Sequence, residues 1–351
     1  MERIVHIIFA LEAGGSENML VDIANEQASL AEVSVILINN RYNAQLVNRI
    51  NPNVHFYALQ RQEGDKRSML FLLRLWKLLL VLRPHVIHCH NHNIIRLLPM
   101  YRHRTVLTIH CLKVPPEYLR KYRRVYSVSS AVAHDIRVRT GISSPVVLNG
   151  INFPNILQRS DYLYRGEKKI RIVQVGRMVH EIKGQHVLLR ALYKLIVSEH
   201  YNNISVDFIG TGPSMDFLQS LAANLHLQSQ VSFLGEKDRQ WIYEHLSSYD
   251  ILVQPSLSEG FGLTVLEGIA AGLPVIASDH AGPLEILRDI PIGFLFRSGD
   301  VDDLADTIKK VIAQMQEMNL QPLCDVSREI ANTRYSIRRT AFEYIDHYSH
   351  M

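Results

Sequence analysis

The sequence predicts an α/β protein built from two doubly wound domains. Short runs rich in Val and Ile alternate with longer stretches of helical pattern, the runs are continuously apolar, and the whole series occurs twice. Alternating strands and helices are typical of parallel sheets, and continuously apolar strands are typical of sheets covered on both faces. At roughly 150 residues per domain, the 351 residues of the chain suffice for two such domains.

The first series lies in residues 1–155, which we expect to form an N-terminal domain. Its helical patterns include Glu17 to Leu30 and Ser68 to Leu82. A polar stretch from Ile151 to Lys169 follows, where the periodic pattern lapses, and we interpret it as the interdomain linker. The candidate strands of this domain are, in order, IVHIIF, VSVILI, VIHCH, TVLTIH, VYSVS and VVLN.

The second series lies in residues 156–333, and its candidate strands are IRIVQVG, VDFIG, VSFLG, DILVQP, PVIAS and GFLF. It ends in two or three helices, one of them over Asp302 to Met318. Residues 334–351 are expected to form a last helix, free to pack back on the first domain. Such sheets bind ligands at the carboxyl ends of their strands, so we expect the site in a cleft between the two facing domains.

Composition excludes several classes of protein. With 47% apolar and 21% charged residues, the chain is neither disordered, collagen-like nor a coiled coil. Three scattered cysteines form no disulfide framework or CxxC knuckle and favour a reducing compartment. The start of the chain lacks the pattern of a secretory signal. The apolar segment Met69 to Leu82 is shorter than the roughly 20 residues of a membrane span and carries Arg74 and Lys77. A cytoplasmic protein is expected.

The densest motif is SEGFGLTVLEG, Ser258 to Gly268, directly after the strand DILVQP. It places Glu259 and Glu267 eight residues apart around a Gly-X-Gly turn at a strand-to-helix junction. Glycines let backbone N–H groups approach a ligand, and the free N–H groups of a helix start favour anions, so the turn suits a phosphate. An alternative remains open, because Thr264 and Glu267 also match a capping box that only satisfies the helix end.

Two other strand ends carry loops that favour anions. VGRMVHEIKGQ places Arg177 and Lys183 after the first strand of the second domain, where charge-assisted bonds could neutralise a diphosphate. LEAGGSEN places Gly14 and Gly15 before a helix, after the first strand of the chain. Solvated surface cations and a lone Gly-Gly pair are also common without a function, so both loops gain weight from their place at the expected cleft.

Two classes of nucleotide-binding protein are disfavoured. GTGPSM, Gly210 to Met215, lacks the third glycine of a dinucleotide fingerprint and lies on a middle strand of the second series. The sequence has no GxxxxGK[ST] phosphate loop. Neither a nicotinamide dehydrogenase nor a P-loop ATPase is therefore expected.

The histidines suggest a metal site, which we do not expect. In HCHNH, alternation along a strand would put His88, His90 and His92 on one face, yet no carboxylate cluster or cysteine pair accompanies them. The acidic group that begins at Asp300 is better interpreted as the cap of a helix. His110 ends the strand TVLTIH and faces the proposed cleft, either as a packed or as a catalytic histidine.

Taken together, these segments resemble the retaining glycosyltransferases of family 4 (glycosyl transferases group 1), which have the two-domain GT-B fold. In the second half, the resemblance rests on VGRMVHEIKG, FIGTGP, the E-x7-E motif EGFGLTVLE, GLPVIASDHAGPLEI and GFLFRSGDVDDLA, in the family's order and approximate spacing. In the first half it is looser and rests on GGSE, VIHCH, TIH, SVSSAV and VLNGIN. The resemblance spans nearly the whole chain.

The resemblance implies a role for each matching residue. Glu259 would contact the hexose of the donor and take a catalytic part, and His110 would lie near the same sugar. Glu267 would hold the ribose hydroxyls of the nucleotide. Arg177 and Lys183 would stabilise the departing diphosphate, which gains negative charge in the transition state. Further contacts with the donor are implied for Gly15, Gly210, Gly235, Lys237, Gly260, Phe261, Gly262 and Leu263.

The implied reaction moves a sugar from a nucleotide diphosphate to a glycan or lipid-linked acceptor, with retention at the anomeric carbon. UDP is favoured only as the commonest donor nucleotide, and the setting would be bacterial-type surface polysaccharide, lipopolysaccharide or glycolipid synthesis. No cofactor and no essential metal are expected. The alternatives are a nucleotide-sugar epimerase or a phosphorylase of the same fold, and a non-catalytic protein that binds nucleotide sugars.

Charge is distributed unevenly along the chain. Residues 1–155 carry a net charge of +9, whereas residues 156–351 carry −5. The basic residues concentrate between Arg96 and Arg139, where aromatic and apolar residues accompany them. Such a surface attracts anionic lipid, so peripheral contact with the inner face of a membrane is one hypothesis and a solvated basic face is the other. No nucleic-acid-binding module is recognised, and no nucleic-acid partner is expected.

Overall fold

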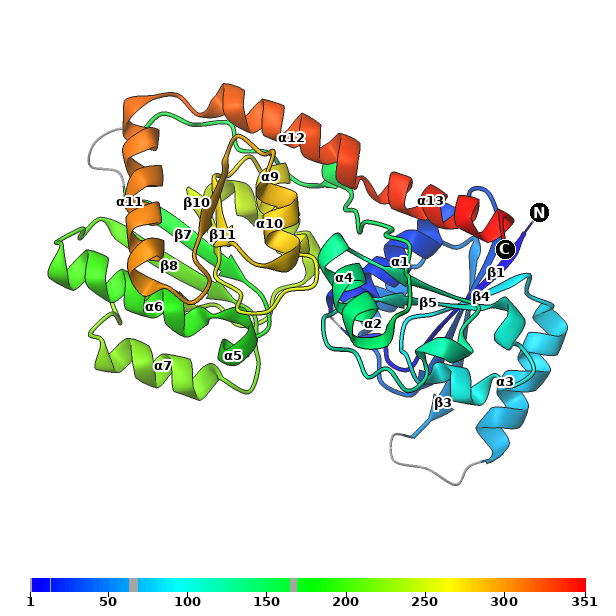
Figure 1. Ribbon diagram of the computed structural model, residues 1–351. Helices are drawn as coiled ribbons and strands as arrows, with labels where there is room; N and C mark the ends of the chain where they lie inside the picture. The colour runs from blue at the N-terminus through cyan, green and yellow to red at the C-terminus, as the bar shows by residue number, and fades with distance from the viewer. Residues whose placement is uncertain (1, 13, 63–68, 165–168) are drawn as a thin grey trace. The chain divides into compact units, whose positions relative to one another are not determined.

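The computed structural model describes residues 2–12, 14–62, 69–164 and 169–351. The chain forms two compact units (Figure 1): unit 1 comprises Met1–Gly150 and Tyr335–Met351, and unit 2 comprises Ile151–Arg334. Each unit contains a six-stranded sheet whose neighbouring strands are all parallel. The predicted fold class, with two doubly wound sheets, is confirmed.

The sheet of unit 1 has the strand order β3-β2-β1-β4-β5-β6. Because the chain winds to one side from β1 and then to the other side from β4, the order reverses between these two strands. Its strands are β1 (Arg3–Ile8), β2 (Glu32–Asn39), β3 (Val54–Arg61), β4 (Val86–Cys89), β5 (Thr105–Ile109) and β6 (Arg124–Ser127). Its helices are α1 (Gly15–Gln27), α2 (Ala44–Asn48), α3 (Met69–Leu82), α4 (Ser130–Thr140) and α13 (Ile337–Ser349).

The sheet of unit 2 repeats this plan, with the order β12-β11-β10-β7-β8-β9 and a reversal between β7 and β10. Its strands are β7 (Ile170–Val175), β8 (Ile204–Ile209), β9 (Val231–Phe233), β10 (Ile251–Gln254), β11 (Val275–Ser278) and β12 (Gly293–Phe296). Its helices include α5 (His180–Lys183), α6 (Gln185–Tyr193), α7 (Met215–Asn224), α8 (Arg239–His245), α9 (Leu263–Ala270), α10 (Ala281–Leu287) and α11 (Val301–Glu317). The last helix that begins in this unit is α12 (Gln321–Tyr335).

Apolar side chains fill both faces of the two sheets. Strands β2, β4, β5 and β10 are buried along almost their whole length, as their continuous apolar runs predict. The helix α3 instead buries one face, which carries Phe71, Leu75 and Leu79 at helical spacing. Within the described ranges, no helix is both long enough and apolar enough to cross a bilayer.

The terminal helix α13 belongs to unit 1. It packs against α1 (Figure 1), and Gly150 at the end of the first segment lies so close to Ser336 that a Cβ atom there would meet the Ser336 carbonyl carbon at 2.5 Å. The hydroxyl of Thr340 also donates a hydrogen bond to the carbonyl of Leu148 (2.7 Å). Unit 1 is therefore completed by residues from the far end of the sequence.

The structure differs from the expectations at two places, and parts of two further predicted segments lie outside the described residues. The segment VVLN forms no strand, since only an isolated bridge joins Val146 to Ser127. The strand β3 was not predicted, because it lacks a continuous apolar run, and of its residues only Val54 and Leu59 are buried. The predicted helix from Ser68 is described only from Met69 onward, and residues 165–168 of the predicted linker likewise lie outside the described residues.

The acidic group before α11 is a helix cap, as predicted. The side chain of Asp300 accepts a hydrogen bond from the backbone N–H of Asp303 (3.0 Å). It thereby satisfies one of the N–H groups that the first turn of a helix leaves without an intrahelical acceptor.

Candidate functional site

The predicted donor residues of unit 2 lie in the loops that follow strands β7, β8, β9 and β10 and in helices α5 and α9, which come after two of these strands. All of these loops lie at the carboxyl edge of the sheet, because the strands are parallel. The loops after β7 and β10 are neighbours at the reversal of strand order, where doubly wound sheets bind their ligands. The candidate site of unit 2 is therefore this edge.

Lys183 and Glu259 form an ion pair between the β7 and β10 loops. The Nζ of Lys183 lies 2.5 Å from Oε2 of Glu259, and 23% and 16% of the two side chains are exposed. The hydroxyl of Ser256 also lies 3.4 Å from the same carboxylate oxygen. The structure thus brings these two predicted residues together. Arg177, in the same loop as Lys183, is exposed and its side chain is available to a ligand.

The capping-box interpretation of Thr264 and Glu267 is wrong. Helix α9 begins at Leu263, and its N-cap is Gly262, with φ of 109° and no side-chain cap. Thr264 is therefore the second residue of the helix and cannot cap it. No side chain occupies this cap, and within the first turn the backbone N–H of Val265 donates to the carbonyl of Gly262 (3.0 Å).

Glu267 lies one turn into α9, beside a residue that the sequence analysis did not select. Its Oε1 lies 4.0 Å from Nε of Arg239, the first residue of α8, and only 13% and 12% of the two side chains are exposed. The guanidinium of Arg239 also lies 5.0 Å from the ring centroid of Tyr243. Arg239 therefore positions the carboxylate of Glu267. No sequence motif marks it, because the two residues lie on different helices.

The predicted glycines divide into packed and open positions. A Cβ atom at Gly210 would lie 2.1 Å from the carbonyl oxygen of Gly176, so this glycine permits one loop to pack against another. Gly235, with φ of 70°, has no neighbouring atom within 4 Å of such a Cβ and lies open beside Lys237, whose ammonium lies 5.5 Å from the Trp241 ring. Phe261 is buried, and its backbone contacts Gly282. Gly260 and Leu263 flank this turn.

The predicted anion site at Gly15, in unit 1, contains an acidic side chain. Gly15 is the first residue of α1, and its N-cap, Gly14, contributes no side-chain hydrogen bond. The carboxylate of Glu17 folds over Gly14, where it accepts a hydrogen bond from Ser16 (2.6 Å). Burial raises the pKa of Glu17. A diphosphate at Gly15 would meet this carboxylate, so Glu17 must be protonated or turn away for an anion to bind.

His110 follows β5 in unit 1 and belongs to a row of histidines. Its Nε2 lies 3.4 Å from Nδ1 of His90, whose Nε2 lies 3.1 Å from Nδ1 of His6. His88 lies beside this row, with its ring stacked on that of His90 at 4.5 Å. Burial lowers the pKa of His6 and of His110 to about 4. The sequence analysis missed His6, because a single histidine within an apolar strand shows no motif.

We expected His88, His90 and His92 to lie on one face of a strand, but His92 does not lie with the other two. Strand β4 ends at Cys89, and His92 lies beyond it, where its ring stacks on Tyr118 at 6.3 Å. The ligating atoms of His6, His88 and His90 do lie within 4.8 Å of one another. Each of their six ring nitrogens, however, already has a hydrogen-bond partner within unit 1. A metal ion would have to replace these bonds.

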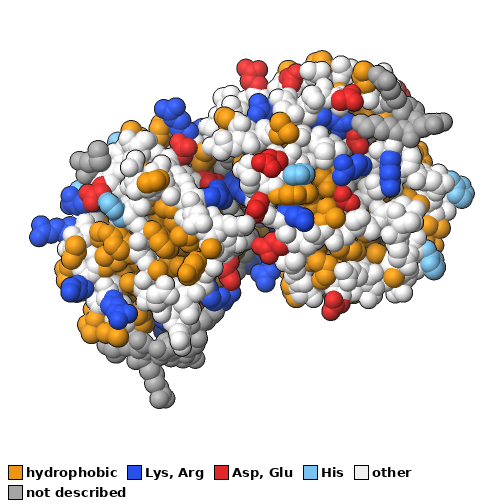
Figure 2. Space-filling view, turned by 180° about the vertical axis from the view of Figure 1, so that it is seen from behind, with side chains coloured by type: hydrophobic (Ala, Val, Ile, Leu, Met, Phe, Trp, Pro, Cys, Tyr) orange, Lys and Arg blue, Asp and Glu red, His pale blue; other side chains and the backbone are white. Residues whose placement is uncertain are grey.

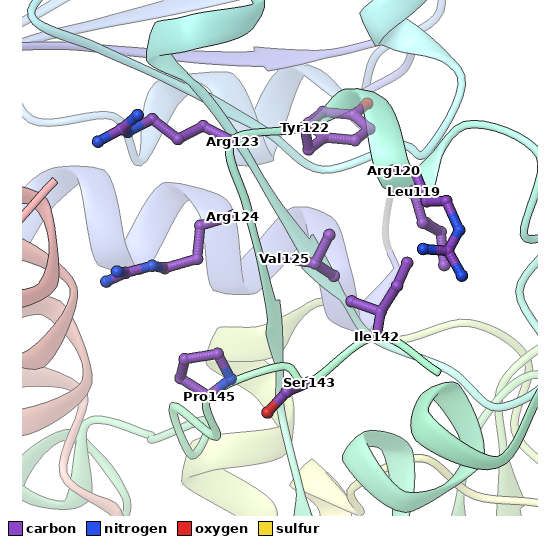
Figure 3. A pocket seen from close by; sticks show the side chains of 9 residues that line it. All are labelled: Leu119, Arg120, Tyr122, Arg123, Arg124, Val125, Ile142, Ser143 and Pro145. Atoms are coloured by element: carbon purple, nitrogen blue, oxygen red, sulfur yellow. The ribbon is translucent and has the colours of Figure 1, made fainter. Parts of the chain in front are cut away.

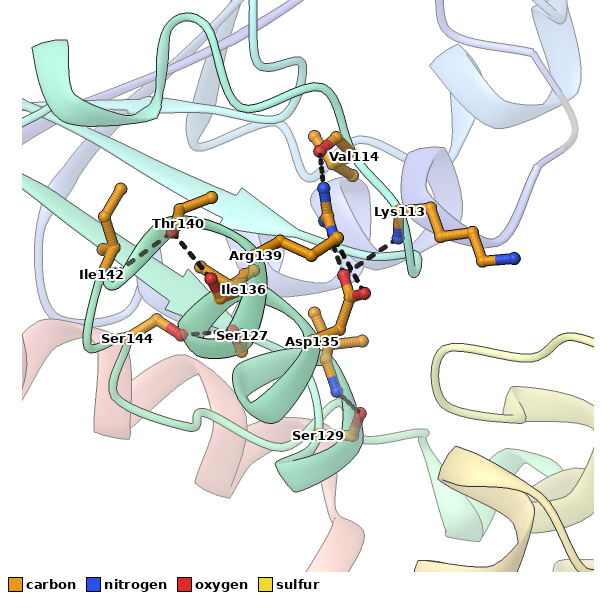
Figure 4. Close-up of polar contacts among 11 residues, drawn as sticks. Lys113, Val114, Ser127, Ser129, Asp135, Ile136, Arg139, Thr140, Ile142 and Ser144 are labelled. Carbon is orange, nitrogen blue, oxygen red and sulfur yellow. Dashed lines mark hydrogen bonds and ion pairs between the residues drawn. The ribbon is translucent and has the colours of Figure 1, made fainter.

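Much of the basic segment from Arg96 to Arg139 is used within unit 1. Arg139 forms a bidentate ion pair with Asp135 (2.6 and 2.8 Å) and donates to the carbonyl of Val114, while Asp135 also accepts from the backbone of Lys113 (Figure 4). The Arg139 hydrogen bond holds the pKa of Asp135 below its usual value. Part of the predicted basic surface therefore stabilises loops of unit 1. Because an acidic residue compensates some of its charge, fewer cations are available to a ligand than the sequence count suggests.

Three further arginines border an open pocket of about 550 Å³ at the amino edge of this sheet (Figure 3). Arg123 and Arg124 extend to one side of it and Arg120 to another. Arg120 donates to the carbonyl of Thr140 (2.6 Å), and Arg123 donates to that of Met351 (2.8 Å). The pocket is lined by Leu119, Arg120, Tyr122, Arg123, Arg124, Val125, Ile142, Ser143 and Pro145.

Helix α3 presents a second surface that the sequence analysis did not single out. Opposite its buried face, the apolar side chains of Leu70, Leu73, Leu80 and Val81 are exposed. The basic residues within the helix are exposed as well, and apolar and basic side chains lie interspersed on the molecular surface (Figure 2). A helix of this kind is amphipathic in the manner of interfacial helices.

Two family models match consecutive parts of the chain. The model described as Glycosyltransferase Family 4 matches residues 13–153, and the model described as Glycosyl transferases group 1 matches residues 161–321. The first model thus lies in unit 1, except for its last three residues, 151–153, which belong to unit 2. The second model lies entirely in unit 2.

Among curated proteins, the chain is similar to Protein CapJ of Staphylococcus aureus, with 29% identity over 211 residues, 58% of this chain and 51% of that protein. It is also similar to the D-inositol 3-phosphate glycosyltransferase of Nocardia farcinica, with 30% identity over 181 residues, 50% of this chain and 39% of that protein. The chain thus spans about half or less of the length of the curated relatives it matches.

Among solved structures, Anabaena HepE in complex with UDP and glucose superposes with a TM-score of 0.82. The two chains share 19% sequence identity, and the superposition covers 100% of each. At this level of identity, the similarity concerns the fold of the chain.

Proposed function

Because the chain belongs to glycosyltransferase family 4 and has the GT-B fold, we propose that it is a retaining, metal-independent glycosyltransferase. It transfers a hexose from a nucleotide diphosphate to a hydroxyl group of a glycan or lipid-linked acceptor. The bond between the anomeric carbon and the diphosphate breaks, a bond to the acceptor oxygen forms on the same face, and the acceptor hydroxyl loses its proton. UDP is the proposed nucleotide, supported by the UDP that HepE carries.

The observation that carries this proposal is the Lys183–Glu259 pair at the reversal of strand order in unit 2. A carboxylate and an ammonium at this edge offer opposite charges to the two ends of the reacting bond. Lys183, together with Arg177, stabilises the departing diphosphate, whose negative charge increases as the bond breaks. Glu259 contacts the hexose, where positive charge develops at the anomeric carbon.

The remaining donor contacts follow from the local geometry. The uncapped first turn of α9 binds phosphate oxygens through backbone N–H groups. Glu267, held by Arg239, accepts hydrogen bonds from the ribose hydroxyls. The open backbone around Gly235 and Lys237 receives the base. His110 and the start of α1 at Gly15 supply the contacts of unit 1 with the donor.

Two competing activities use the same fold. A nucleotide-sugar epimerase would convert the donor with no acceptor present, and a binding protein would retain donor affinity without turnover. The presence of Glu259, Lys183 and Arg177 together supports a transferase over the second alternative.

The first experiment is a thermal-shift and calorimetric panel of UDP, GDP, ADP and their common sugar conjugates, with and without EDTA. Stabilisation by one nucleotide diphosphate despite the chelator is the expected result. Loss of binding in EDTA would contradict metal independence. Stabilisation by none of these compounds would contradict the donor site itself. Conversion of a sugar nucleotide without any acceptor would favour the epimerase.

We further propose that the enzyme acts at the inner face of a membrane, in surface polysaccharide, lipopolysaccharide or glycolipid synthesis. Exposed leucines on α3 beside basic residues support contact with anionic lipid, since apolar groups insert and cations attract the headgroups. The test is flotation with vesicles of phosphatidylcholine alone or with phosphatidylglycerol, at low and high salt. Binding confined to anionic vesicles and weakened by salt is expected, and no binding at low salt would refute the proposal.

A further inference from the structure

The row of buried histidines in unit 1 crosses the reversal of strand order. His6 lies on β1, His90 directly follows β4, and His110 directly follows β5. The side chains join in a continuous hydrogen-bonded row, which starts at Gln27 on α1 and reaches His110 after three contacts, of 2.8, 3.1 and 3.4 Å. Because each contact is made by ring nitrogens, each has a direction that depends on where the protons lie.

A contact with the terminal helix α13 fixes the orientation of the Gln27 amide, and with it the direction of the first hydrogen bond in the row. The amide nitrogen Nε2 of Gln27 donates to the backbone carbonyl of Ala341 on α13 (3.3 Å). A carbonyl oxygen only accepts, so the amide group of Gln27 must face it and the amide oxygen must face His6. That oxygen also only accepts, so Nε2 of His6 carries the proton and donates it (2.8 Å).

Each neutral imidazole in the row donates at one nitrogen and accepts at the other, so the direction of the first hydrogen bond fixes the direction of the next ones. Burial keeps the pKa of His6 near 4 and that of His90 well below its usual value, so at neutral pH each ring carries one proton. With its proton on Nε2, His6 must accept at Nδ1, where its hydrogen-bond partner among the described residues is Nε2–H of His90 (3.1 Å). His90 must then accept at its own Nδ1, from Nε2–H of His110 (3.4 Å).

His110 is the end of the row, and its second nitrogen is available. Among the described residues, the Nδ1 atom of His110 is buried and has no hydrogen-bond partner. We propose that Gln27, His6 and His90 hold His110 in the tautomer protonated on Nε2, so that its Nδ1 accepts a hydrogen bond from a hydroxyl group of the substrate. In this arrangement His6, His90 and Gln27 are positioning residues, and His110 alone touches the ligand.

This arrangement restricts what His110 can bind. A neutral ring with a lone pair at Nδ1 accepts from a hydroxyl or an amide N–H, and it repels a phosphate oxygen, which is itself an acceptor. Resting on the proposed function, the inference therefore assigns His110 to a hydroxyl of the sugar and not to the diphosphate. If the hydrogen bonds of the row ran in the opposite direction, Nδ1 of His110 would carry a proton. It would then donate to an acceptor such as a phosphate oxygen.

Nitrogen NMR of the histidine side chains of the full chain tests the proposal without any substrate. Long-range ¹H–¹⁵N correlation distinguishes a bare ring nitrogen from a protonated one, and the His110 signals are those lost in His110→Gln. The expected result at pH 7.5 is a bare Nδ1 and a protonated Nε2. A proton on Nδ1 of His110 in the wild type would overturn the proposal.

Two variants separate the row from general packing. Gln27→Leu removes the acceptor that fixes the direction, so the His110 signals should shift toward the average of the two tautomers. Thr340→Val is the matched control, because it removes a buried hydroxyl of α13 that donates to the carbonyl of Leu148 (2.7 Å), a contact outside the row. Its His110 signals should not move. Equal shifts in both variants, or none in Gln27→Leu, would contradict the proposal, and the wild-type spectrum decides it if either variant fails to fold.

The hydroxyl contact is tested with the sugar nucleotide that the thermal-shift panel selects. Its binding should move the Nδ1 signal of His110 to lower frequency without protonating it, whereas inorganic phosphate should leave the signal unchanged. A His110 signal that ignores the bound sugar nucleotide would remove the hydroxyl contact. If the panel selects no compound, the proposed function fails, while the tautomer result stands or falls by itself.

Discussion

Lys183 and Glu259 join two loops through an ion pair that is partly exposed to solvent. Only 23% and 16% of the two side chains are exposed, so water screens this pair less than a surface pair, and a diphosphate that binds Lys183 would have to replace the bond to Glu259. On the proposed function, this exchange would release the carboxylate of Glu259 toward the sugar. The pair would thus open when the donor binds.

Replacing Glu259 by Gln should separate chemistry from binding. The amide oxygen still accepts from Lys183, so the free energy of unfolding should change by less than about 1 kcal/mol. Turnover should fall by at least about 100-fold, because the negative charge beside the anomeric carbon is lost. Product formation and calorimetric titration with UDP measure the two effects.

Glu244→Gln is the matched control for that substitution. Glu244 lies on α8 in the same unit and is exposed, with Gln240 as its partner. It should retain full turnover. Normal turnover in Glu259→Gln would refute the role assigned to Glu259, and a large loss of UDP affinity would show that it acts in binding instead.

Glu267→Ala should weaken nucleotide binding by about tenfold or more, because a ribose loses a bidentate acceptor. Thr264→Ala is its control. Since Gly262 and not Thr264 caps α9, this substitution should change the free energy of unfolding by less than about 0.5 kcal/mol. Unfolding in urea and titration with UDP check both. If Thr264→Ala were clearly destabilised and Glu267→Ala bound UDP normally, the capping-box interpretation would be supported instead.

At the residue scale, the sequence predicted residues that belong to recognisable motifs and missed residues that no motif marks. Lys183 and Glu259 were predicted to serve the same diphosphate-sugar site and do lie in contact. Arg239 was missed because its partner, Glu267, lies on another helix. His6 and Gln27 were missed because their partners come from β4 and α13, far away in the sequence.

Helices of unit 2 begin in two different ways. The cap of α11 is a side chain, Asp300, whereas α9 begins at a glycine and leaves its first turn to other groups. A side-chain cap stabilises the helix, and an uncapped turn keeps N–H groups for a ligand. The contrast identifies α11 as a helix whose start is stabilised by its own cap, whereas α9 shares an uncapped start with α6, α7 and α10.

Asp300→Ala should lower the free energy of unfolding of unit 2 by about 1 kcal/mol, the usual contribution of an N-cap. Glu317→Ala, at the exposed end of the same helix, should be nearly neutral and is the control. Urea unfolding, followed by the fluorescence of Trp241, measures the stability of the two variants. UDP affinity is measured alongside. Equal stability of both variants would contradict the role of the cap.

Helix α3 makes a separate prediction about lipid. Leu73→Glu together with Leu80→Glu places two carboxylates on its exposed face, so anionic vesicles should bind at least about tenfold more weakly. Leu30→Glu, also exposed in unit 1 but outside α3, is the control for added charge. Flotation measures binding, and circular dichroism checks the fold. Equal loss in both proteins would place the contact elsewhere.

The elements predicted best are the buried strands, because a continuous apolar run is itself the signal. Eleven of the twelve predicted runs coincide with strands, and VVLN, which forms only a bridge at Val146, does not. Strand β3 was missed because it lies at the edge of the sheet, where only Val54 and Leu59 of its eight residues are buried. Pairing at an edge depends on the neighbouring strand, which a local pattern does not contain.

The whole molecule should respond to acid mainly through unit 1. Burial lowers the pKa of His6 and His110 to about 4, against 6.5 in an unfolded chain, and it also lowers the pKa values of His88 and His90 well below 6.5. At a pH between the folded and unfolded pKa values, the unfolded chain binds more protons than the folded one. The free energy of unfolding should therefore fall as pH drops below about 6.5, by on the order of 2 kcal/mol at pH 5 for each of His6 and His110.

The two tryptophans of the chain allow this to be measured unit by unit, since Trp76 lies in unit 1 and Trp241 in unit 2. Trp241→Phe leaves a reporter in unit 1, and Trp76→Phe leaves one in unit 2. Urea titrations from pH 7.5 to pH 5 should show the larger loss with the first protein. Equal losses in both would mean that the buried histidines do not determine the acid response.

The return of α13 to unit 1 has a consequence for the order in which the protein is made. A ribosome delivers residues 1–150 first, yet the partners of Gln27, His88 and Leu148 on α13 are translated after the whole of unit 2. Unit 2, which is continuous in sequence, can therefore finish folding before the unit that precedes it. A premature stop codon between positions 337 and 341 would remove the Ala341 carbonyl, and it would leave unit 2 intact and the histidine row without its anchor.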